Sequence, residues 1–327
     1  MLIPRFWSRV SSQAVRPDGT QVRFHVWRGS RTTPAEAQAL AQEAVARMAE
    51  RIQRGAGFPE KYSYGDRPLR EEVVREIVGA GTEDDPDAAL TRNSYGALVL
   101  NAARAFFIDV DVPGSEPRET SQGQPHSAPH PAQSLWGLVD SLPLPGGLRS
   151  IVDQFRPAPG SGSSAPPSAP AAPADPASRA VEQLRRFVGG RPGWRVRVYR
   201  TYAGLRYLVT HAPFSPTDAE TQAVLAAVGA DAQYIRLCQV QKSFRARLTP
   251  KPWRIGIPNP PATFPYEGPD QERAMRAWES RYDQASAGRA ACRFVEEIGT
   301  GAEHPDLAPI RALHDEHTRA TSGLPLA

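Results

Sequence analysis

The sequence predicts an α+β fold whose strands pair antiparallel, and three observations support this. Strand-like segments follow one another in pairs joined by short turns, instead of alternating with helices as in a parallel sheet. Helix-like segments begin at capping residues and carry one apolar stripe. A Pro-rich stretch separates two such α+β regions. With 40% apolar residues in 327, the chain can build a core on both sides of that stretch.

Four parts are expected along the chain. Residues 1–112 form an N-terminal α+β part, and residues 113–178 form a Pro/Ala/Ser-rich linker that contains an amphipathic island at 134–155. Residues 179–268 form a basic α+β part, and residues 269–327 form a C-terminal helical part.

The N-terminal part opens with two strands, 6–10 and 22–27, around a Pro-Asp-Gly turn at 17–19. A helix follows from Thr33, because Thr33 and Glu36 make a capping box. The apolar stripe expected on that helix is Ala39, Leu40, Ala44, Met48 and Ile52.

Beyond this helix, the pattern predicts a second helix over about 68–78. It also predicts a hairpin of strands 95–100 and 105–112, turning at 101–104.

The linker has a composition unlike the rest of the chain. It holds 14 of the 33 prolines, with many Ala, Ser and Gly, and cannot bury enough apolar surface to order itself. We expect a flexible segment that favours polyproline II. The apolar residues of the island suit two short amphipathic helices, which either dock on the chain's own domain or bind a protein partner.

The second half again mixes helices and strands. Asp175 and Pro176 are typical of a helix start, and Thr201 to Gly204 are typical of a turn between two strands. The expected helices are 175–188, 217–228, 270–297 and 305–321, and the expected strands are 194–200, 205–210, 234–238 and 242–248.

The charge distribution indicates a polyanionic partner. The whole chain carries a net charge of +4, but residues 190–256 carry 11 basic and 3 acidic side chains, a net +8. A local excess of this size is typical of nucleic-acid or nucleotide binding, although a solvated basic face is the plain alternative. Only three of the basic residues of the chain are Lys, which indicates a GC-rich, bacterial genome.

Several classes of protein are not expected. No run of apolar residues is long enough for a membrane span, and the N-terminus turns polar at once, so we expect a cytoplasmic protein with no membrane partner. Two cysteines exclude a disulfide scaffold. No Walker loop, dinucleotide fingerprint or nucleophile elbow is present, and His314 and His317 lack the spacing of a zinc protease motif.

The first candidate site is an Asp-x-Asp pair at the end of an apolar strand. Asp109 and Asp111 project from one face of the strand, because alternate side chains point the same way. Two carboxylates so placed repel each other unless a divalent cation or an arginine neutralises them. The alternative is two solvated acids at a strand end.

The second candidate is the strand-turn-strand over 198–211. Thr201, Gly204 and the turn amides can cradle phosphate oxygens, and Arg206 adds a forked cationic donor. The alternative is an ordinary hairpin with His211 at a strand end.

The third candidate is a basic strand and the proline-stiffened segment after it. Phe244, Ala246 and Leu248 are expected in the core, while charges and one aromatic ring remain for phosphates and bases. The expected binding residues are Arg245, Arg247, Lys251, Trp253 and Arg254. A solvated strand face is the alternative.

These three motifs, in this order, resemble the archaeo-eukaryotic primase superfamily, which includes the primase-polymerases. The resemblance covers about residues 90–112 and 190–256. It implies an antiparallel RRM-like catalytic core with flanking helices, interrupted by the long Pro-rich linker.

The resemblance also implies residue roles and a place in DNA replication or repair. Asp109 and Asp111 would be catalytic and hold Mg²⁺ or Mn²⁺, while the second and third motifs would contact nucleoside triphosphates and nucleic acid. Two positions depart from the family pattern. Arg206 stands where the family has a histidine, and Asp231 is the one candidate for a third acid between Glu220 and Glu267.

Three hypotheses for function follow. The first is a primase-polymerase-like nucleotidyltransferase that acts on nucleic acid with a divalent metal. The second is a nucleic-acid-binding module on the same fold without catalysis. The third is an interaction or scaffold protein that works through the island at 134–155.

Overall fold

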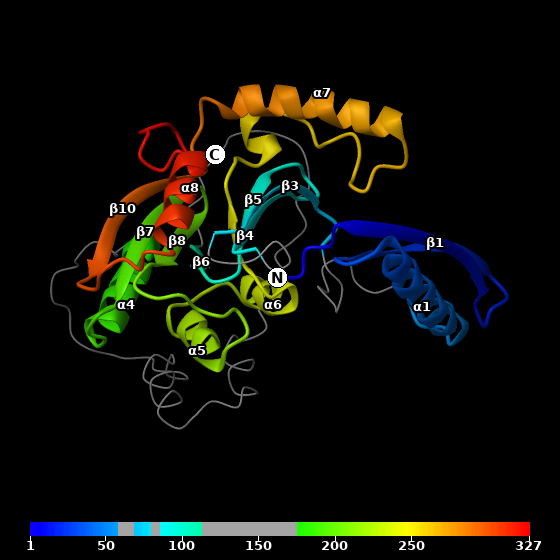
Figure 1. Cartoon of the computed structure of the whole chain (residues 1–327), viewed down its shortest axis with the longest axis horizontal. Helices are drawn as coiled ribbons and strands as arrows, with labels where there is room; N and C mark the ends of the chain where they lie inside the picture. Colours follow the sequence, from blue (N-terminus) through cyan, green and yellow to red (C-terminus); the bar gives the residue numbers. More distant parts are fainter. Residues whose placement is uncertain (58–68, 80–85, 113–174) are drawn as a thin grey trace, which may run out of the picture.

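The computed structural model describes residues 1–57, 69–79, 86–112 and 175–327. The amphipathic island, and the linker up to residue 174, lie outside the described residues. The mixed α+β class with antiparallel sheets is confirmed. Figure 1 shows a main body built around two sheets and an arm made from the N-terminal residues.

The first sheet of the body has the strand order β10-β7-β8-β6, and every neighbouring pair is antiparallel. The hairpin expected around 201–204 is confirmed, because β7 and β8 are consecutive and paired. Its strands are β6 (Phe106–Asp111), β7 (Arg195–Thr201), β8 (Gly204–Val209) and β10 (Cys292–Gly299).

The second sheet has the order β3-β4-β5-β9, again antiparallel throughout. Because β9 pairs with β5, and β8 pairs with β6, both sheets join strands from the two sides of the linker. Its strands are β3 (Glu72–Ile77), β4 (Ala88–Arg92), β5 (Leu98–Ala102) and β9 (Phe244–Arg247).

Helices cover the first sheet. α4 (Pro176–Gly189) packs on β10 and β7, and it meets α5 (Ala219–Ala227) where Gln183 donates a hydrogen bond to the Ala227 carbonyl. α6 (Ala232–Gln241) reaches β6 through the Tyr234 hydroxyl, and α8 (Ala308–Thr318) lies on the sheet through His314. One core cluster results, with Phe106, Tyr207 and Leu225 fully buried inside it.

A separate, smaller cluster supports the top of the body in Figure 1. α7 (Pro269–Ser286) buries Met275, Trp278 and Tyr282 against Ile255 and Ile257. The short 3₁₀ helix η1 (Pro252–Ile255) follows β9 and packs beside α7. The segment that contains Pro250 and Pro252 thus runs from β9 of the second sheet to η1, beside α7.

The arm consists of β1 (Phe6–Val15), β2 (Gln21–Ser30) and α1 (Pro34–Gln53). Thr33 caps α1 by accepting from the Glu36 amide at 3.1 Å, as expected, whereas the Glu36 carboxylate turns to Ser30 and Thr32. The helix covers one face of the two-stranded ribbon. Its buried stripe is Ala37, Ala41, Ala44, Val45 and Ile52, so Ala39 and Leu40 of the predicted stripe are instead exposed.

Four predicted elements are wrong. The helix expected over 68–78 is strand β3 where it is described, because β3 finds a partner in β4. The hairpin expected over 95–112 does not form, because β5 joins the second sheet and β6 joins the first. The strand expected at 234–238 is helix α6, capped by Asp231, and the end of the helix expected over 270–297 is strand β10.

In the described part of the chain, no helix is both long enough and apolar enough to cross a membrane.

Candidate nucleic-acid interface

Asp109 and Arg206 form an ion pair between β6 and β8 of the first sheet. They lie directly opposite each other on β6 and β8, so both side chains leave the same face. Arg206 Nε lies 2.7 Å from Asp109 Oδ1, and Arg206 Nη2 lies 3.0 Å from Oδ2. The arginine side chain is only 4% exposed and the aspartate side chain 35%. Both carboxylate oxygens therefore have a permanent cationic partner.

Helix α8 covers the buried end of this pair. His314 is fully buried, and its Nε2 lies 3.5 Å from Arg206 Nη1. Its Nδ1 lies 3.1 Å from Asp315 Oδ1, an oxygen that also accepts from the Tyr199 hydroxyl at 2.7 Å. Because Arg206 can only donate, this geometry assigns a neutral imidazole that donates from Nδ1 to Asp315 and accepts at Nε2.

The electrostatics of this cluster follow from its burial. Burial lowers the pKa of His314 to about 4, and the nearby Arg206 charge acts in the same direction. Burial also raises the pKa of the Cys292 thiol to about 11. Burial alone would lower the pKa of Arg206, but the charge and hydrogen bonds of Asp109 raise it above its ordinary value. The cluster thus holds one permanent ion pair and a neutral histidine at pH 7.

Asp111 lies at the exposed end of the same strand. It stands opposite Gly204, the first residue of β8 after the hairpin turn. A Cβ atom at position 204 would come 2.1 Å from the Val110 carbonyl oxygen, so glycine is required for the close approach of the two strands. Thr201, at the other side of this turn, is half-buried at the end of β7. The hairpin places Asp111 beside the 202–203 turn.

The donor set does not fit a two-metal centre. Arg206 occupies both oxygens of Asp109. Asp231 does reach β6, since its amide donates to the Asp109 carbonyl at 3.1 Å, but its carboxylate caps α6 by accepting from the Tyr234 amide at 2.7 Å. Among the residues that the structure describes, no three His, Cys, Asp or Glu side chains gather in a way that could hold a metal ion.

Arg245 is used inside the second sheet. It donates to Glu71 Oε1 at 2.7 Å and also to the Asn101 side chain, and Glu71 accepts from Thr91 at 2.5 Å. The side chains of Arg245 and Glu71 are 11% and 8% exposed. Arg245 therefore belongs to a largely buried polar network that joins β4, β5 and β9 to Glu71, just before β3. Its neighbours Phe244 and Ala246 are buried in the core as expected.

Arg247 links the two sheets. Its guanidinium donates to the Thr249 carbonyl at 2.7 Å, and its own carbonyl accepts from Arg206 Nη1 at 2.8 Å. Arg247 is half-buried, so part of its charge remains at the surface near η1.

The clearest open feature is a group of aromatic and cationic side chains around η1, which we call the η1 platform: Tyr95, Tyr202, Lys251, Trp253 and Arg254. Trp253 is 49% exposed, a large value for so apolar a ring. Tyr95 packs against its edge with ring centres 5.4 Å apart, and Lys251 Nζ lies 5.5 Å from the indole centre. The Arg254 guanidinium lies 3.8 Å from the Tyr202 ring centre. The β4–β5 turn and the β7–β8 turn, far apart in the sequence, thus both contact η1 and the residue before it.

The chain segment that contains η1 carries no acids of its own. Residues 232–266 contain six basic side chains and no Asp or Glu. The β7–β8 turn that bears Tyr202 adjoins Asp111 across the hairpin register, which leaves one carboxylate at the edge of the platform. α7, which packs beside η1, adds four acids and three arginines, so the positive excess belongs to the 232–266 segment itself.

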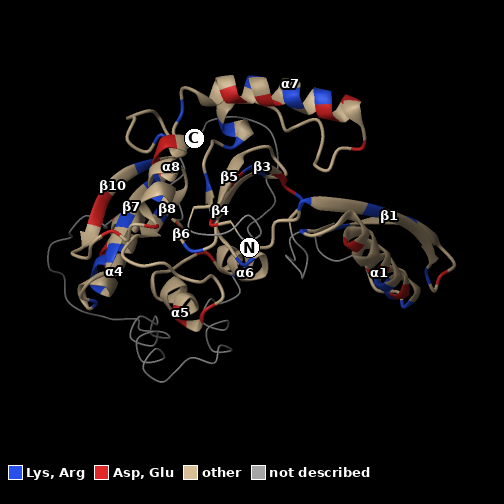
Figure 2. Cartoon of the chain, in the orientation of Figure 1, with Lys and Arg blue, Asp and Glu red and all other residues tan. Residues whose placement is uncertain are grey.

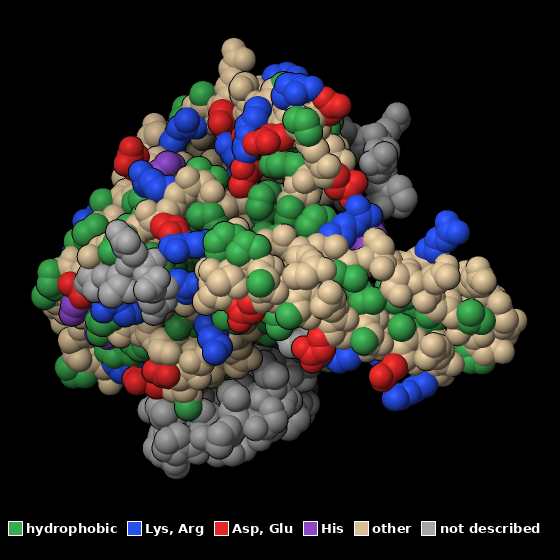
Figure 3. All heavy atoms as spheres, turned by 45° about the vertical axis from the view of Figure 1, so that its right-hand side comes forward, with side chains coloured by type: hydrophobic (Ala, Val, Ile, Leu, Met, Phe, Trp, Pro, Cys, Tyr) green, Lys and Arg blue, Asp and Glu red, His purple; other side chains and the backbone are tan. Residues whose placement is uncertain are grey.

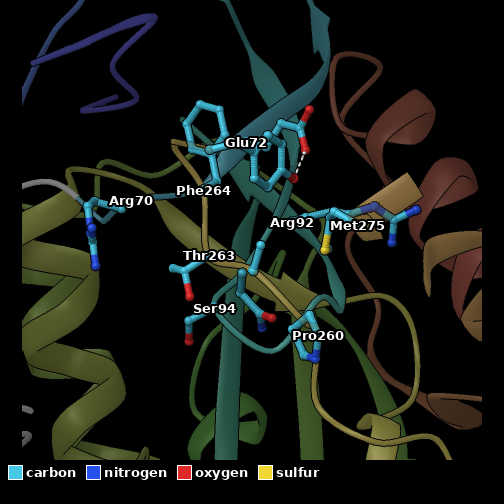
Figure 4. A pocket seen from close by; sticks show the side chains of 11 residues that line it. Arg70, Glu72, Arg92, Ser94, Pro260, Thr263, Phe264 and Met275 are labelled. Atoms are coloured by element: carbon cyan, nitrogen blue, oxygen red, sulfur yellow. Dashed lines mark hydrogen bonds between the residues drawn. The ribbon is translucent and has the colours of Figure 1, made fainter. Parts of the chain in front are cut away.

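A separate small hollow lies between β3, the β4–β5 turn and the loop before α7 (Figure 4). Its walls include Arg70, Ser94, Thr263 and Phe264, and across it the Tyr266 hydroxyl donates to Glu72 at 2.7 Å. Arg92, which also lines it, pairs with Glu279 at 3.1 Å. None of the residues expected to bind ligand lines this hollow.

Two groups of important residues escaped the sequence analysis. Tyr95 joins Trp253 although 158 positions separate them, and no local pattern signals such a contact. The sequence analysis considered His314 only as a poor metal ligand and gave Asp315 no role, whereas the two residues complete the buried cluster around Arg206. Comparison of the chain with models of protein families, with curated proteins and with solved structures found no match.

Proposed function

We propose that this protein is a nucleic-acid-binding module that holds a single strand on the η1 platform. The observation that carries the proposal is the half-exposed indole of Trp253 between Tyr95 and Lys251. Every nucleobase has a π face, so an exposed ring among cations binds single strands with little regard to sequence. Duplexes keep their bases stacked internally and cannot use such a ring.

The order of elements also supports this proposal. β6, α4, β7, β8, the pair α5 and α6, and β9 follow one another as β-α-β-β-α-β. That order is typical of ferredoxin-like and RRM-like domains. In such a domain β6 would lie between β8 and β9, and here β6 pairs with β8 and contacts β9.

Nucleotidyl transfer with Mg²⁺ or Mn²⁺ and nucleoside triphosphates is the second candidate. The exposed carboxylate of Asp111 next to the 202–203 turn favours it, since an acid there would face a nucleic acid bound on the platform. The bidentate pairing of Asp109 with Arg206 argues against it, because a metal would have to displace a largely buried arginine. We therefore rank binding without catalysis first.

The test measures binding of a fluorescein-labelled single-stranded DNA by fluorescence anisotropy at several salt concentrations. We expect affinity to fall as salt rises, because Lys251 and Arg254 would release counterions from phosphates. Trp253→Ala should weaken binding about tenfold, since stacking on an aromatic ring is worth roughly 1–3 kcal/mol per base. Trp253→Phe should recover most of the affinity.

A matched control is Arg236→Ala. Arg236 is exposed and lies in the same acid-free stretch, but on α6, away from the platform. It should change affinity less than Lys251→Ala does. Equal losses from both variants, or binding that ignores Trp253→Ala, would refute the platform. Template-dependent nucleotide incorporation that is lost in Asp111→Asn would favour the second candidate instead.

A further inference from the structure

The arm formed by β1, β2 and α1 contributes little to the core of the body. It has its own apolar cluster, in which Val26, Ala44 and Val45 pack with Val10 and Phe24. Of the helices and strands that the structure describes, only α1 packs extensively on the ribbon. Figure 3 shows the arm standing out from the body at the lower right. A projecting element of this kind needs a reason other than stability of the body.

The base of the arm is tied to the body by charged contacts. Arg5 makes a bidentate pair with Glu76 of β3, with its shorter contact at 2.6 Å, and Arg9 pairs with Glu267 at 2.6 Å. The amide of Leu2 donates to the Gln241 carbonyl at the end of α6. These contacts hold the near end of the ribbon and leave its far half projecting.

The two faces of the ribbon differ in composition. One face packs on α1 through Val10, Phe24 and Val26. The other, which we call the outer face, is mostly polar where it is exposed, and it also carries Trp27 at its base and Val15 near its tip. Its exposed members are Arg9, Ser11, Gln13, Val15, Gln21, Arg23 and His25. The register puts Gln13 opposite Arg23, and Ser11 opposite His25. A row of hydrogen-bonding side chains therefore crosses both strands.

The charges on the arm are also separated by face. Neither strand contains an Asp or Glu, whereas α1 carries three Glu and two Arg. In Figure 2 the strands of the arm are tan and blue, while red appears on α1 and at the turn. The strands thus bring no acid of their own to the outer face. On this face, Arg9 is paired with Glu267 at the base, and Arg23 is the arginine of the projecting half, where it can meet a polyanion.

We propose that the outer face of the β1–β2 ribbon binds duplex DNA by lying in its major groove. Two paired strands are about 5 Å apart, and the major groove of B-form DNA is about 12 Å wide, so it admits a two-stranded ribbon. Ten residues of strand span about 33 Å, enough to follow one turn of the duplex. Gln13 and Arg23 are side-chain types that hydrogen-bond to adenine and guanine edges, and Arg9, paired at the base, lies nearest the body.

This site is distinct from the η1 platform, so the two can fail independently. A protein with both would grip a duplex with the arm and an adjoining single strand with Trp253.

The experiment titrates a short fluorescein-labelled DNA duplex of mixed sequence and follows anisotropy. Arg23→Glu is expected to weaken duplex binding at least about tenfold, since one arginine contact to a base or phosphate is worth roughly 1–3 kcal/mol. The slope of log affinity against log salt should also become shallower by about one, the amount that one phosphate contact contributes. Its affinity for the labelled single strand should stay unchanged.

The matched control is Arg47→Glu, which changes the charge by the same amount on the opposite side of the same arm. Arg47 is exposed on α1, where it pairs with Glu43. This variant should bind the duplex within about twofold of wild type. Gln13→Glu is a second outer-face variant that should weaken binding, and circular dichroism checks that all three variants fold.

Four outcomes would overturn the proposal. The first is an equal loss of duplex affinity in Arg23→Glu and in Arg47→Glu. The second is duplex binding that depends only on Trp253. The third is equal affinity for an RNA duplex of the same sequence, whose deep and narrow major groove excludes side chains. The fourth is a dimer in sedimentation that Arg23→Glu dissociates without any effect on DNA binding, which would make the outer face an interface between two copies of the chain.

Discussion

The buried cluster around Arg206 and the open platform around Trp253 contain the same kinds of residue, but they differ in what the residues contact. Arg206 meets Asp109, His314 and a backbone carbonyl, and its side chain is 4% exposed. Lys251 instead lies over the half-exposed ring of Trp253, and Arg254 lies over the ring of Tyr202. In the cluster the protein's own carboxylate satisfies the arginine, whereas on the platform the cations surround apolar π faces.

The difference shows how burial changes the meaning of a charged residue. Burial removes both charges of an ion pair from water, so each charge depends on the other for its stabilisation. Neither side chain can then leave its partner for a ligand without a large cost in free energy. A half-buried cation over an aromatic ring, such as Lys251 or Arg254, still reaches the surface and can meet a phosphate there. The two regions can therefore be separated by asking which substitutions damage the fold and which damage binding.

The largest effect is expected from Asp109→Asn. The substitution leaves the charge of Arg206 buried without its carboxylate, so the free energy of unfolding should fall by about 3 kcal/mol. Asp111→Asn, at the exposed end of the same strand, should change it by less than about 1 kcal/mol. Urea unfolding at pH 7 measures both.

The same experiment tests whether a metal replaces the ion pair. If Asp109 and Asp111 shared Mn²⁺, millimolar Mn²⁺ would raise the unfolding midpoint of the wild type and of neither variant. We expect no such shift. A double variant, Asp109→Leu with Arg206→Met, should recover part of the lost stability, since no buried charge is then left unpaired.

The next effect concerns pH. His314 has a pKa of about 4 in the folded protein, below the ordinary value near 6.5, so between these values the unfolded chain binds the extra proton. The stability contributed by the neutral histidine is complete above about pH 6.5 and is lost as the pH falls toward 4, by about 3 kcal/mol in all. His314→Gln should flatten this slope.

The control for this prediction is the set of other groups that titrate in acid. Asp315 resists protonation: burial alone would raise its pKa, but hydrogen bonds from His314 and Tyr199 lower it, so its own loss of stability comes only in stronger acid. His211 and His317, whose pKa values burial also lowers, act in the same direction as His314 in every variant. A slope that stays unchanged in His314→Gln would assign the acid sensitivity to those residues.

The sequence predicted the local elements well where a cap or turn residue marks them. Thr33 caps α1, and Pro176 lies at the first turn of α4. The turn before Gly204 separates β7 from β8 as expected. The alternation of Phe244, Ala246 and Leu248 correctly predicted the buried side of β9. In each case a few adjacent residues determine the outcome.

The sequence could not predict pairings that depend on distant partners. β5 and β6 adjoin in the chain, yet they enter different sheets because β9 and β8 are available to them. The guanidinium of Arg206 was expected to bind phosphate. Only the register of β6 and β8, which places Arg206 opposite Asp109, shows that it forms an ion pair within the protein. Asp231 was the candidate third acid, and its position before Tyr234 instead makes it a helix cap. Residue type alone does not determine these contacts.

A smaller effect is expected at the hairpin that connects the two regions. Gly204→Ala should lower the free energy of unfolding by about 2 kcal/mol, because its Cβ would meet the Val110 carbonyl at 2.1 Å and β8 would have to shift away from β6. Gly189→Ala, at the end of α4 with open space around it, should be neutral or slightly stabilising. Thermal melts of the two variants give the comparison. Equal stabilities would mean that the strands adjust at no cost and that Gly204 is free to serve a ligand.

The smallest effect on stability is expected on the platform itself. Trp253 is half exposed and packs mainly on the edge of Tyr95, so Trp253→Ala should change the free energy of unfolding by less than about 1 kcal/mol. Affinity for single-stranded DNA should nevertheless fall about tenfold. Urea unfolding and anisotropy on the same preparation separate the two quantities. A loss of stability comparable to that of Asp109→Asn would mean that the indole is a structural support for η1, and the contrast between a closed cluster and an open platform would then fail. Retained stability with lost affinity is the result that only a binding surface produces, because a residue that merely packs must affect folding before it affects a ligand.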